Sequence, residues 1–127
     1  MAKVLVVEDN ELNLNLKLFC DLLTIKDHEV ILSKDGFNIL EIVIEQLPDL
    51  ILMDIQLADV SGLDLIKILK NNPKTNKIPI IVITAFAMKN EVMRISESGC
   101  DLYLSKPVSI DNFFFSVERF ISNNNTV

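Results

Sequence analysis

Short runs of apolar residues alternate along the chain with longer segments in which apolar residues recur every three or four positions. The short runs predict β-strands and the periodic segments predict amphipathic helices. The strands are expected at residues 4–7, 29–32, 50–53, 80–83 and 102–104. The first, third and fourth runs lack in-and-out alternation, which is typical of parallel strands covered on both faces. The second and fifth are more mixed, so we expect them at or near the sheet edges.

Helices are predicted over residues 11–24 and 36–47, after Ser61 and Gly62, from near Lys89, and from Ser109. Gly99 is well placed to end the fourth helix in the left-handed conformation. The expected buried stripes are Phe37, Leu40, Ile44 and Leu47 in the second helix, Leu65, Ile66 and Leu69 in the third, and Phe113, Val117, Phe120 and Ile121 in the last.

Repeated strand–helix units of this kind predict an α/β fold with a doubly wound, five-stranded parallel sheet. The expected strand order is 2-1-3-4-5, in a flavodoxin-like sandwich of three layers. Residues 1–122 are expected to form one domain, followed by a short polar tail at 123–127 and by no output domain.

Composition narrows the classes of function. The net charge of −6 argues against a nucleic-acid surface, because phosphate backbones require clustered Lys and Arg. No targeting segment is visible and no apolar stretch approaches the length of a membrane span. Cys20 and Cys100 lack metal-ligand spacing, so we interpret them as reduced thiols of a cytoplasmic protein.

Charged residues stand where three of the apolar runs stop. Glu8 and Asp9 follow the first run, Asp54 ends the third, and Lys106 comes shortly after the last. The carboxyl ends of parallel strands meet at one edge of the sheet, so these residues are expected to converge there. Three carboxylates suit Mg²⁺, and the lysine supplies a cation for a phosphoryl group. The pattern therefore predicts a site that takes up and holds phosphate.

With these residues placed, the chain resembles the receiver domains of two-component response regulators over its whole length. The motifs that carry the resemblance occur in order: Glu8-Asp9, Asp54, Gly62, Thr84-Ala85, Tyr103 and Lys106-Pro107. The segments VVEDNELN, LMDIQL, ITAFAMK and GCDLYLSKP look like those of single-domain cell-division regulators within this family.

The resemblance implies that Asp54 accepts a phosphoryl group from a phosphohistidine. Asp9 and Asp54 would ligate Mg²⁺ directly, together with the backbone carbonyl of Gln56, and Glu8 would act through a water. Mn²⁺ is expected to substitute for Mg²⁺. The metal would neutralise charge that builds on the phosphoryl oxygens during transfer.

The remaining motif residues are expected to clamp and to switch. Lys106 would hold the phosphoryl group from the side opposite the metal, aimed inward by a cis peptide before Pro107. The Thr84 hydroxyl would bond the phosphoryl group, and Tyr103 would turn from an outward to a buried position. Phosphorylation would thus bias a pre-existing two-state element.

The resemblance also implies partners rather than substrates. Histidine kinases, histidine phosphotransfer proteins and kinase-like proteins are expected to bind, in phosphorelay signalling of cell division. Recruitment to the cell poles by membrane kinases and a weak or phosphorylation-dependent homodimer are further expectations, without membrane insertion. The chain is not expected to be an enzyme, since it would catalyse only its own phosphoryl transfer and dephosphorylation.

Two other classes of function remain as alternatives. A phosphohydrolase of the haloacid dehalogenase type also uses an Asp after a strand, but it normally needs a second Asp two residues on as general acid. Gln56 stands there and cannot donate a proton in that role. A receiver-like binding module that acts without phosphorylation would be expected to have lost Asp54, an acid of the pair or Lys106, and all are present.

Overall fold

The computed structural model describes residues 3–7, 14–33, 38–54, 62–84, 89–105 and 109–125. Its strands are β1 (Lys3–Val7), β2 (Glu29–Ser33), β3 (Leu50–Asp54), β4 (Ile80–Thr84) and β5 (Leu102–Ser105). Its helices are α1 (Leu14–Ile25), α2 (Ile39–Gln46), α3 (Gly62–Lys70), α4 (Lys89–Glu97) and α5 (Ile110–Asn125). All neighbouring strands are parallel, in the order β2-β1-β3-β4-β5. The predicted fold class and strand order are confirmed.

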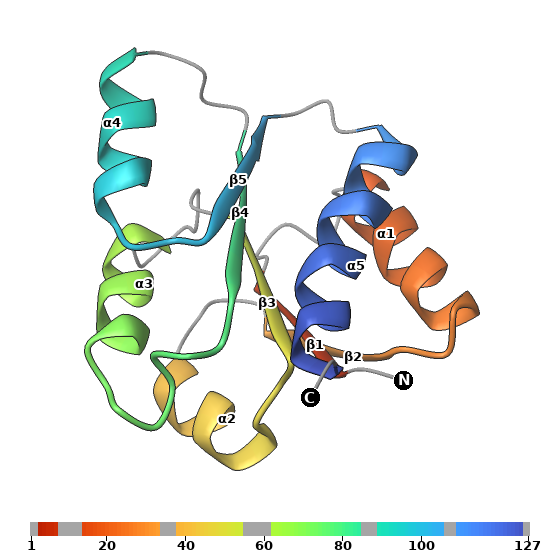
Figure 1. Cartoon of the computed structure of the whole chain (residues 1–127), viewed down its shortest axis with the longest axis horizontal. Coiled ribbons are helices and arrows are strands. Elements are labelled where there is room, and N and C mark those ends of the chain that lie inside the picture. Colours follow the sequence, from red (N-terminus) through yellow and green to blue (C-terminus); the bar gives the residue numbers. More distant parts are fainter. Residues whose placement is uncertain are drawn as a thin grey trace.

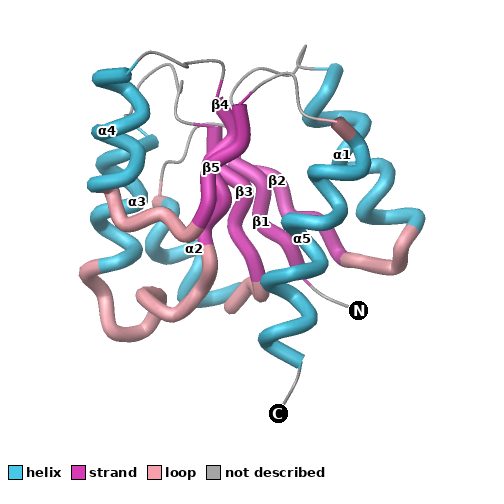
Figure 2. The backbone as a smooth tube through the Cα atoms, turned by 45° about the horizontal axis from the view of Figure 1, so that its top comes forward, coloured by secondary structure: helices cyan, strands magenta, loops and turns pink. Residues whose placement is uncertain are grey.

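The sheet separates two layers of helices. Helices α2, α3 and α4 cover one face, and α1 and α5 cover the other (Figures 1 and 2). Side chains alternate between the faces along each strand, so Leu5 and Val7 join the core under α2, α3 and α4. Val4 and Val6 join the core under α1 and α5. We call these the α2–α4 core and the α1/α5 core.

The strands reach further than the apolar runs predicted. β2, β3, β4 and β5 each include one more residue at the carboxyl end, because the parallel ladder continues through the pairs Val7↔Ser33, Asp54↔Ile83 and Thr84↔Ser105. The mixed strands β2 and β5 lie at the two edges of the sheet, as their composition predicts. Every predicted strand is therefore present; all but β1 are longer than expected at the carboxyl end, and β1 is longer by Lys3 at its amino end.

Most helix predictions also agree with the structure. Leu65, Ile66 and Leu69 are buried in α3, and Phe113, Val117 and Ile121 are buried in α5, with Phe120 half-buried. α4 begins at Lys89, and Gly99 after it has φ of 95°, in the region that favours glycine. α5 continues to Asn125, into the segment expected to be a polar tail.

The stripe predicted for α2 is wrong at its end. Leu47 has φ of 48° and donates its N–H to the carbonyl of Val43, so the chain leaves the helix there. Its side chain is 62% exposed, and Ile39 and Val43 are the residues that α2 buries. Leu40 and Ile44 are half-buried, and Phe37 lies outside the described residues.

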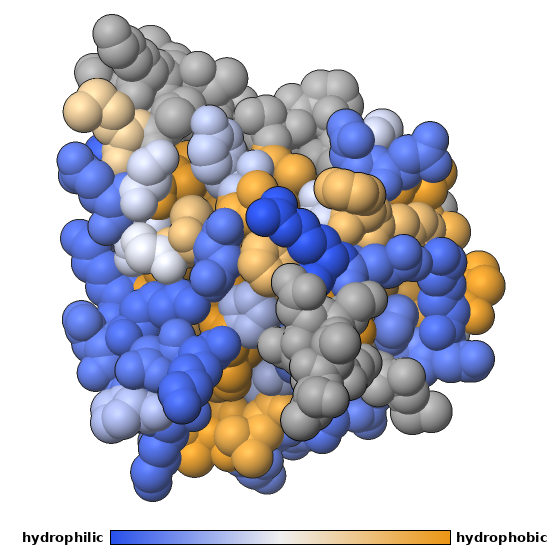
Figure 3. Space-filling model, viewed as in Figure 1, coloured by the Kyte–Doolittle hydropathy of each residue, from blue (hydrophilic) through white to orange (hydrophobic). Residues whose placement is uncertain are grey.

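A polar surface covers the side of the molecule that carries α3 and α4. Hydrophilic residues dominate there in the space-filling view (Figure 3). A cleft of about 300 Å³ opens between these helices and is lined by Leu63, Asp64, Lys67, Arg94 and Glu97. None of these residues belongs to the predicted phosphate site. Within the part of the chain that the structure describes, no helix is long and apolar enough to cross a membrane.

Candidate functional site

The carboxyl ends of β1 and β3 lie side by side. β1 ends at Val7, which precedes Glu8 in the sequence and pairs with Met53. Asp54 is the next residue and the last of β3, opposite Ile83 of β4. Neighbouring strands in a sheet are about 4.8 Å apart. The backbone of Asp54 therefore lies beside the end of β1, as the sequence predicted.

The ends of β4 and β5 meet in the same way. Thr84 is the last residue of β4 and pairs with Ser105, which precedes Lys106 in the sequence. Tyr103 pairs with Val82, is half-buried, and packs against the α2–α4 core. Thr84 and Tyr103, the predicted switch residues, thus stand on adjacent strands, Thr84 at the carboxyl end of β4 and Tyr103 two residues before the end of β5.

Several predicted site residues lie outside what the structure describes, namely Glu8, Asp9, Gln56, Lys106 and Pro107, together with the side chains of Asp54 and Thr84. Gly62 is the first residue of α3. Among the described side chains, no group of three or more His, Cys, Asp or Glu gathers to hold a metal ion. The predicted donors are carboxylate and carbonyl oxygens, the ligands that Mg²⁺ prefers. The chemistry of this donor set fits the predicted metal.

At the amino edge of the sheet, where the strands begin, the structure shows two acids whose role the sequence did not predict, Asp49 and Asp101. Asp49, just before β3, accepts the backbone N–H of Lys3 on Oδ2 at 2.8 Å. In return, its own backbone N–H donates to the Lys3 carbonyl at 2.7 Å. The Lys3 ammonium donates to the Gln46 carbonyl at 3.2 Å and lies 3.7 Å from Glu29. This arrangement, the Asp49 clamp, ties the amino ends of β1 and β3 together.

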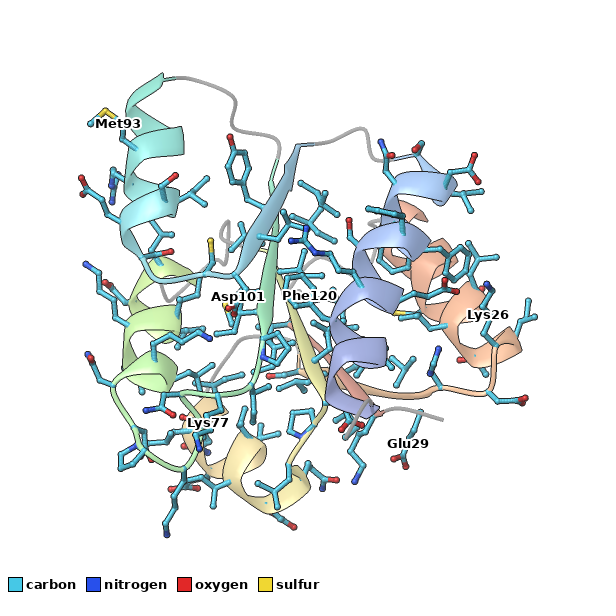
Figure 4. All side chains as sticks on the ribbon, viewed as in Figure 1. Lys26, Glu29, Lys77, Met93, Asp101 and Phe120 are labelled. Carbon is cyan, nitrogen blue, oxygen red and sulfur yellow. The ribbon has the colours of Figure 1, made fainter. Side chains whose placement is uncertain are left out.

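A second clamp repeats the first at β4 and β5. Asp101, just before β5, accepts the backbone N–H of Ile80 on Oδ2 at 2.8 Å (Figure 4). Its own N–H donates to the Ile80 carbonyl at 2.9 Å. The ammonium of Lys70 lies 2.8 Å from the same carboxylate oxygen. We call this arrangement the Asp101 clamp.

Both clamps leave the same signal in the sequence. An aspartate directly precedes an apolar run in Asp49-Leu50 and in Asp101-Leu102. The pattern does not reveal the partner, because the bonded residues are 46 and 21 positions apart in the chain. The partner of each aspartate depends on which strands are neighbours in the sheet. The two clamps can therefore be recognised only from the structure.

The two cysteines show no sign of reactivity. Both thiols are free and half-buried. Burial, followed by the nearby Asp21 carboxylate, raises the pKa of Cys20. Burial also raises the pKa of Cys100, although a hydrogen bond involving Ser98 opposes the shift. Since the thiolate is the nucleophile and metal ligand, a raised pKa makes both roles unfavourable.

Comparison with known proteins defines the family. Residues 4–118 match the response regulator receiver domain, so this chain belongs to that family. The chain is similar to the polar-differentiation response regulator DivK of Brucella anthropi, with 45% identity over 120 residues. The match covers 94% of this chain and 96% of that relative. The predicted resemblance to single-domain cell-division regulators is confirmed.

Solved structures that resemble this chain include receivers with bound metal. The receiver domain of a sensor histidine kinase from Pseudomonas aeruginosa, with a magnesium ion coordinated in its active-site cleft, aligns with a TM-score of 0.84 and 26% identity. That alignment covers 95% of this chain and 98% of the other. The Mn²⁺-bound form of the response regulator Rcp1 aligns with a TM-score of 0.74 and 27% identity, covering 100% and 97%.

Proposed function

We propose that this receiver domain accepts a phosphoryl group from a phosphohistidine onto Asp54 and thereby changes its affinity for partner proteins. The observation that carries the proposal is the position of Asp54, at the end of β3 and beside the ends of β1 and β4. In the sequence, Glu8 and Asp9 directly follow the last residue of β1 and Lys106 directly follows the last residue of β5, so we expect all three at the same edge of the sheet. Membership of the receiver family supports this assignment.

The transfer step uses Asp54 as the nucleophile. A carboxylate oxygen attacks the phosphorus, the phosphorus–nitrogen bond breaks, and its electron pair returns to the imidazole of the donor histidine. Asp9, Asp54 and the Gln56 carbonyl would hold Mg²⁺, with Glu8 acting through a water. When bound, this ion supplies positive charge to the phosphoryl oxygens. The Lys106 ammonium would pair with one of those oxygens in a charge-assisted hydrogen bond.

Thr84 and Tyr103 form the proposed switch. The Thr84 hydroxyl donates to a phosphoryl oxygen, and Tyr103 moves deeper into the α2–α4 core, against which it already packs half-buried. If the inactive state is favoured by about 99:1, reversing that ratio needs about 5.5 kcal/mol. One hydrogen bond to a charged group contributes about 1.5–3 kcal/mol. Partner binding would then supply the rest of the free energy that drives the switch.

The relatives support a proposal for the cellular role. DivK of Brucella anthropi is named for polar differentiation. We place this chain in a phosphorelay that governs cell division or polarity, with histidine kinases, phosphotransfer proteins or kinase-like proteins as its partners. Within the cytoplasm, it would be recruited to the poles by membrane kinases.

The test uses acetyl phosphate as a small phosphodonor. Wild type and Asp54→Asn are incubated with the donor and Mg²⁺, and intact masses are measured, with a chelator added to parallel samples. We expect a gain of one phosphoryl group on wild type alone, and only when Mg²⁺ is present. Equal gain on the variant would refute Asp54 as the acceptor. If neither protein gains mass, beryllofluoride binding with Mg²⁺ separates a site that demands its cognate kinase from a module that works without phosphorylation.

A further inference from the structure

Strand β5 depends on a single neighbour. It has four residues, Leu102–Ser105, and pairs with β4 alone at the edge of the sheet. Yet this strand carries Tyr103 and leads directly to Lys106. The contacts that hold the amino end of β5 therefore help to determine the position of its carboxyl end.

The Asp101 clamp holds that amino end. Ile80 and Asp101 exchange backbone and side-chain hydrogen bonds one position before the first ladder pair, Ile81↔Leu102. The clamp is therefore an extension of the β4–β5 ladder in which one carboxylate replaces a missing backbone acceptor. It sets the register at the point where β5 begins.

Lys70 ties this clamp to a third element. An ammonium has three N–H donors, and at Lys70 three acceptors lie within bonding distance: Asp101 Oδ2 at 2.8 Å, the Ile78 carbonyl at 3.0 Å and the Asn76 carbonyl at 3.3 Å. The Lys70 side chain is 18% exposed, and Lys70 is the last residue of α3. Helix α3, the segment before β4 and the start of β5 are thus joined at one ammonium.

We propose that Lys70 and Asp101 are positioning residues for the phosphoryl site, fixing β5 at its amino end so that Tyr103 and Lys106 are delivered in register with β4. The inference rests on the proposed function, because it assigns a task to β5 in that reaction. Groups that act on a reacting phosphoryl must be held closely, and a misplacement of about 1 Å can cost up to about 100-fold in rate. Removing the Asp101 side chain removes the bonds to the Ile80 N–H and to Lys70, and leaves the start of β5 with the bond from Asp101 N–H to the Ile80 carbonyl and the backbone ladder to β4.

The Asp49 clamp provides a matched control. It has the same reciprocal bonds, from Asp49 to Lys3. Its strands β1 and β3 each have two neighbours in the sheet, so their register is held from both sides. We therefore expect the Asp49 clamp to stabilise the fold without affecting the site. The Asp101 clamp differs because it holds β5, an outer strand with a single neighbour.

The experiment compares Asp101→Ala with Asp49→Ala at a temperature where both variants are fully folded. The rate of phosphorylation by acetyl phosphate at saturating Mg²⁺ is measured, and Mg²⁺ affinity is measured by calorimetry. We expect Asp101→Ala to react about tenfold more slowly, with Mg²⁺ affinity unchanged because the predicted ligands belong to β1, β3 and the segments that follow them. Asp49→Ala is expected to leave both quantities unchanged. Asp101→Asn, which keeps an oxygen for the Ile80 N–H, should restore most of the rate.

Two outcomes would overturn the assignment: a wild-type rate in Asp101→Ala, or an equal slowing in Asp49→Ala, which indicates general destabilisation. Failure of the proposed function gives a different result, since the wild type would then take up no phosphate. In that case hydrogen exchange of the β5 amides still tests the clamp. Faster exchange in Asp101→Ala but not in Asp49→Ala supports it, and equal exchange in the two variants refutes it.

Discussion

Aspartates serve opposite purposes at the amino edge of the sheet, where the strands begin, and at the carboxyl edge, where the strands end. At the amino edge, Asp49 and Asp101 each accept a backbone N–H from the first residue of a neighbouring strand. At the carboxyl edge, Asp54 ends β3 beside β1, the strand that precedes Glu8 and Asp9 in the sequence, and we expect these three acids to lie close together. A carboxylate with hydrogen-bond donors stabilises a fold, whereas like charges at close range destabilise it until a cation binds. The partners of an aspartate therefore decide whether it serves stability or chemistry.

Identical substitutions at the two edges should separate these roles most sharply. Asp54→Asn is expected to lose all phosphate uptake, and in Mg²⁺-free buffer to unfold at a higher temperature, because a repelling charge is removed. Asp49→Asn is expected to keep phosphate uptake and to lose about 1 kcal/mol of unfolding free energy, because the amide oxygen still accepts the Lys3 N–H but without the charge of the carboxylate. Intact mass and urea denaturation measure the two effects. Equal stability of Asp49→Asn and wild type would contradict the role of the amino edge.

Removing the cation of the second clamp tests the amino edge alone. Lys70→Met keeps the length of the side chain but leaves the Asp101 carboxylate without its ammonium, so we expect a loss of about 2 kcal/mol in unfolding free energy. Urea denaturation measures the change. Lys77→Met is a suitable control, because Lys77 is exposed. A loss of the same size in both variants would show that the clamp is not its cause.

The turn that leads into the second clamp should also be sensitive. Gly99 has φ of 95°, and a Cβ placed there would lie 3.5 Å from Lys70 Cγ, which is ordinary contact. The cost of Gly99→Ala is therefore backbone strain, about 1 kcal/mol. Gly99→Asn should cost less, since asparagine adopts positive φ more readily. Thermal unfolding of both variants tests this order, and an alanine variant as stable as wild type would refute it.

An exposed ion pair provides the smallest effect. The Lys26 ammonium lies 3.0 Å from Glu118 Oε1, and the two side chains are 47% and 54% exposed. It also lies 4.4 Å from the centre of the Phe114 ring, a contact that Glu118→Gln preserves. Glu118→Gln should therefore cost no more than about 0.5 kcal/mol, and less in high salt. A loss as large as that in Lys70→Met would show that burial does not distinguish the two ion pairs.

Much of this fold could be predicted because apolar runs report burial directly. The runs that lack alternation became the interior strands β1, β3 and β4, and the mixed runs became the edges. Asp54 and Thr84 were predicted at strand ends and lie there. The carboxyl ends of the strands were underestimated, because a parallel ladder continues into polar residues when its neighbour does.

The amino-edge clamps and the end of α2 could not be predicted. Asp49 and Asp101 acquire partners through strand pairing, which acts across distant parts of the chain. Leu47 fits the helical period, but the left-handed turn at its own position rotates it into solvent. Periodicity describes a helix that continues and carries no information on the residue at which it stops.

The sheet also acts as a partition between two interiors. Val6 and Val7 are adjacent in the chain, yet Val6 packs in the α1/α5 core and Val7 in the α2–α4 core. Substitutions that share no neighbours tend to have additive effects, so repacking beneath α1 and α5 should leave the surroundings of Tyr103 undisturbed. Natural variation in one core can therefore accumulate with little effect on the other, and the surface over α1 and α5 can change shape while the proposed switch residues keep their surroundings.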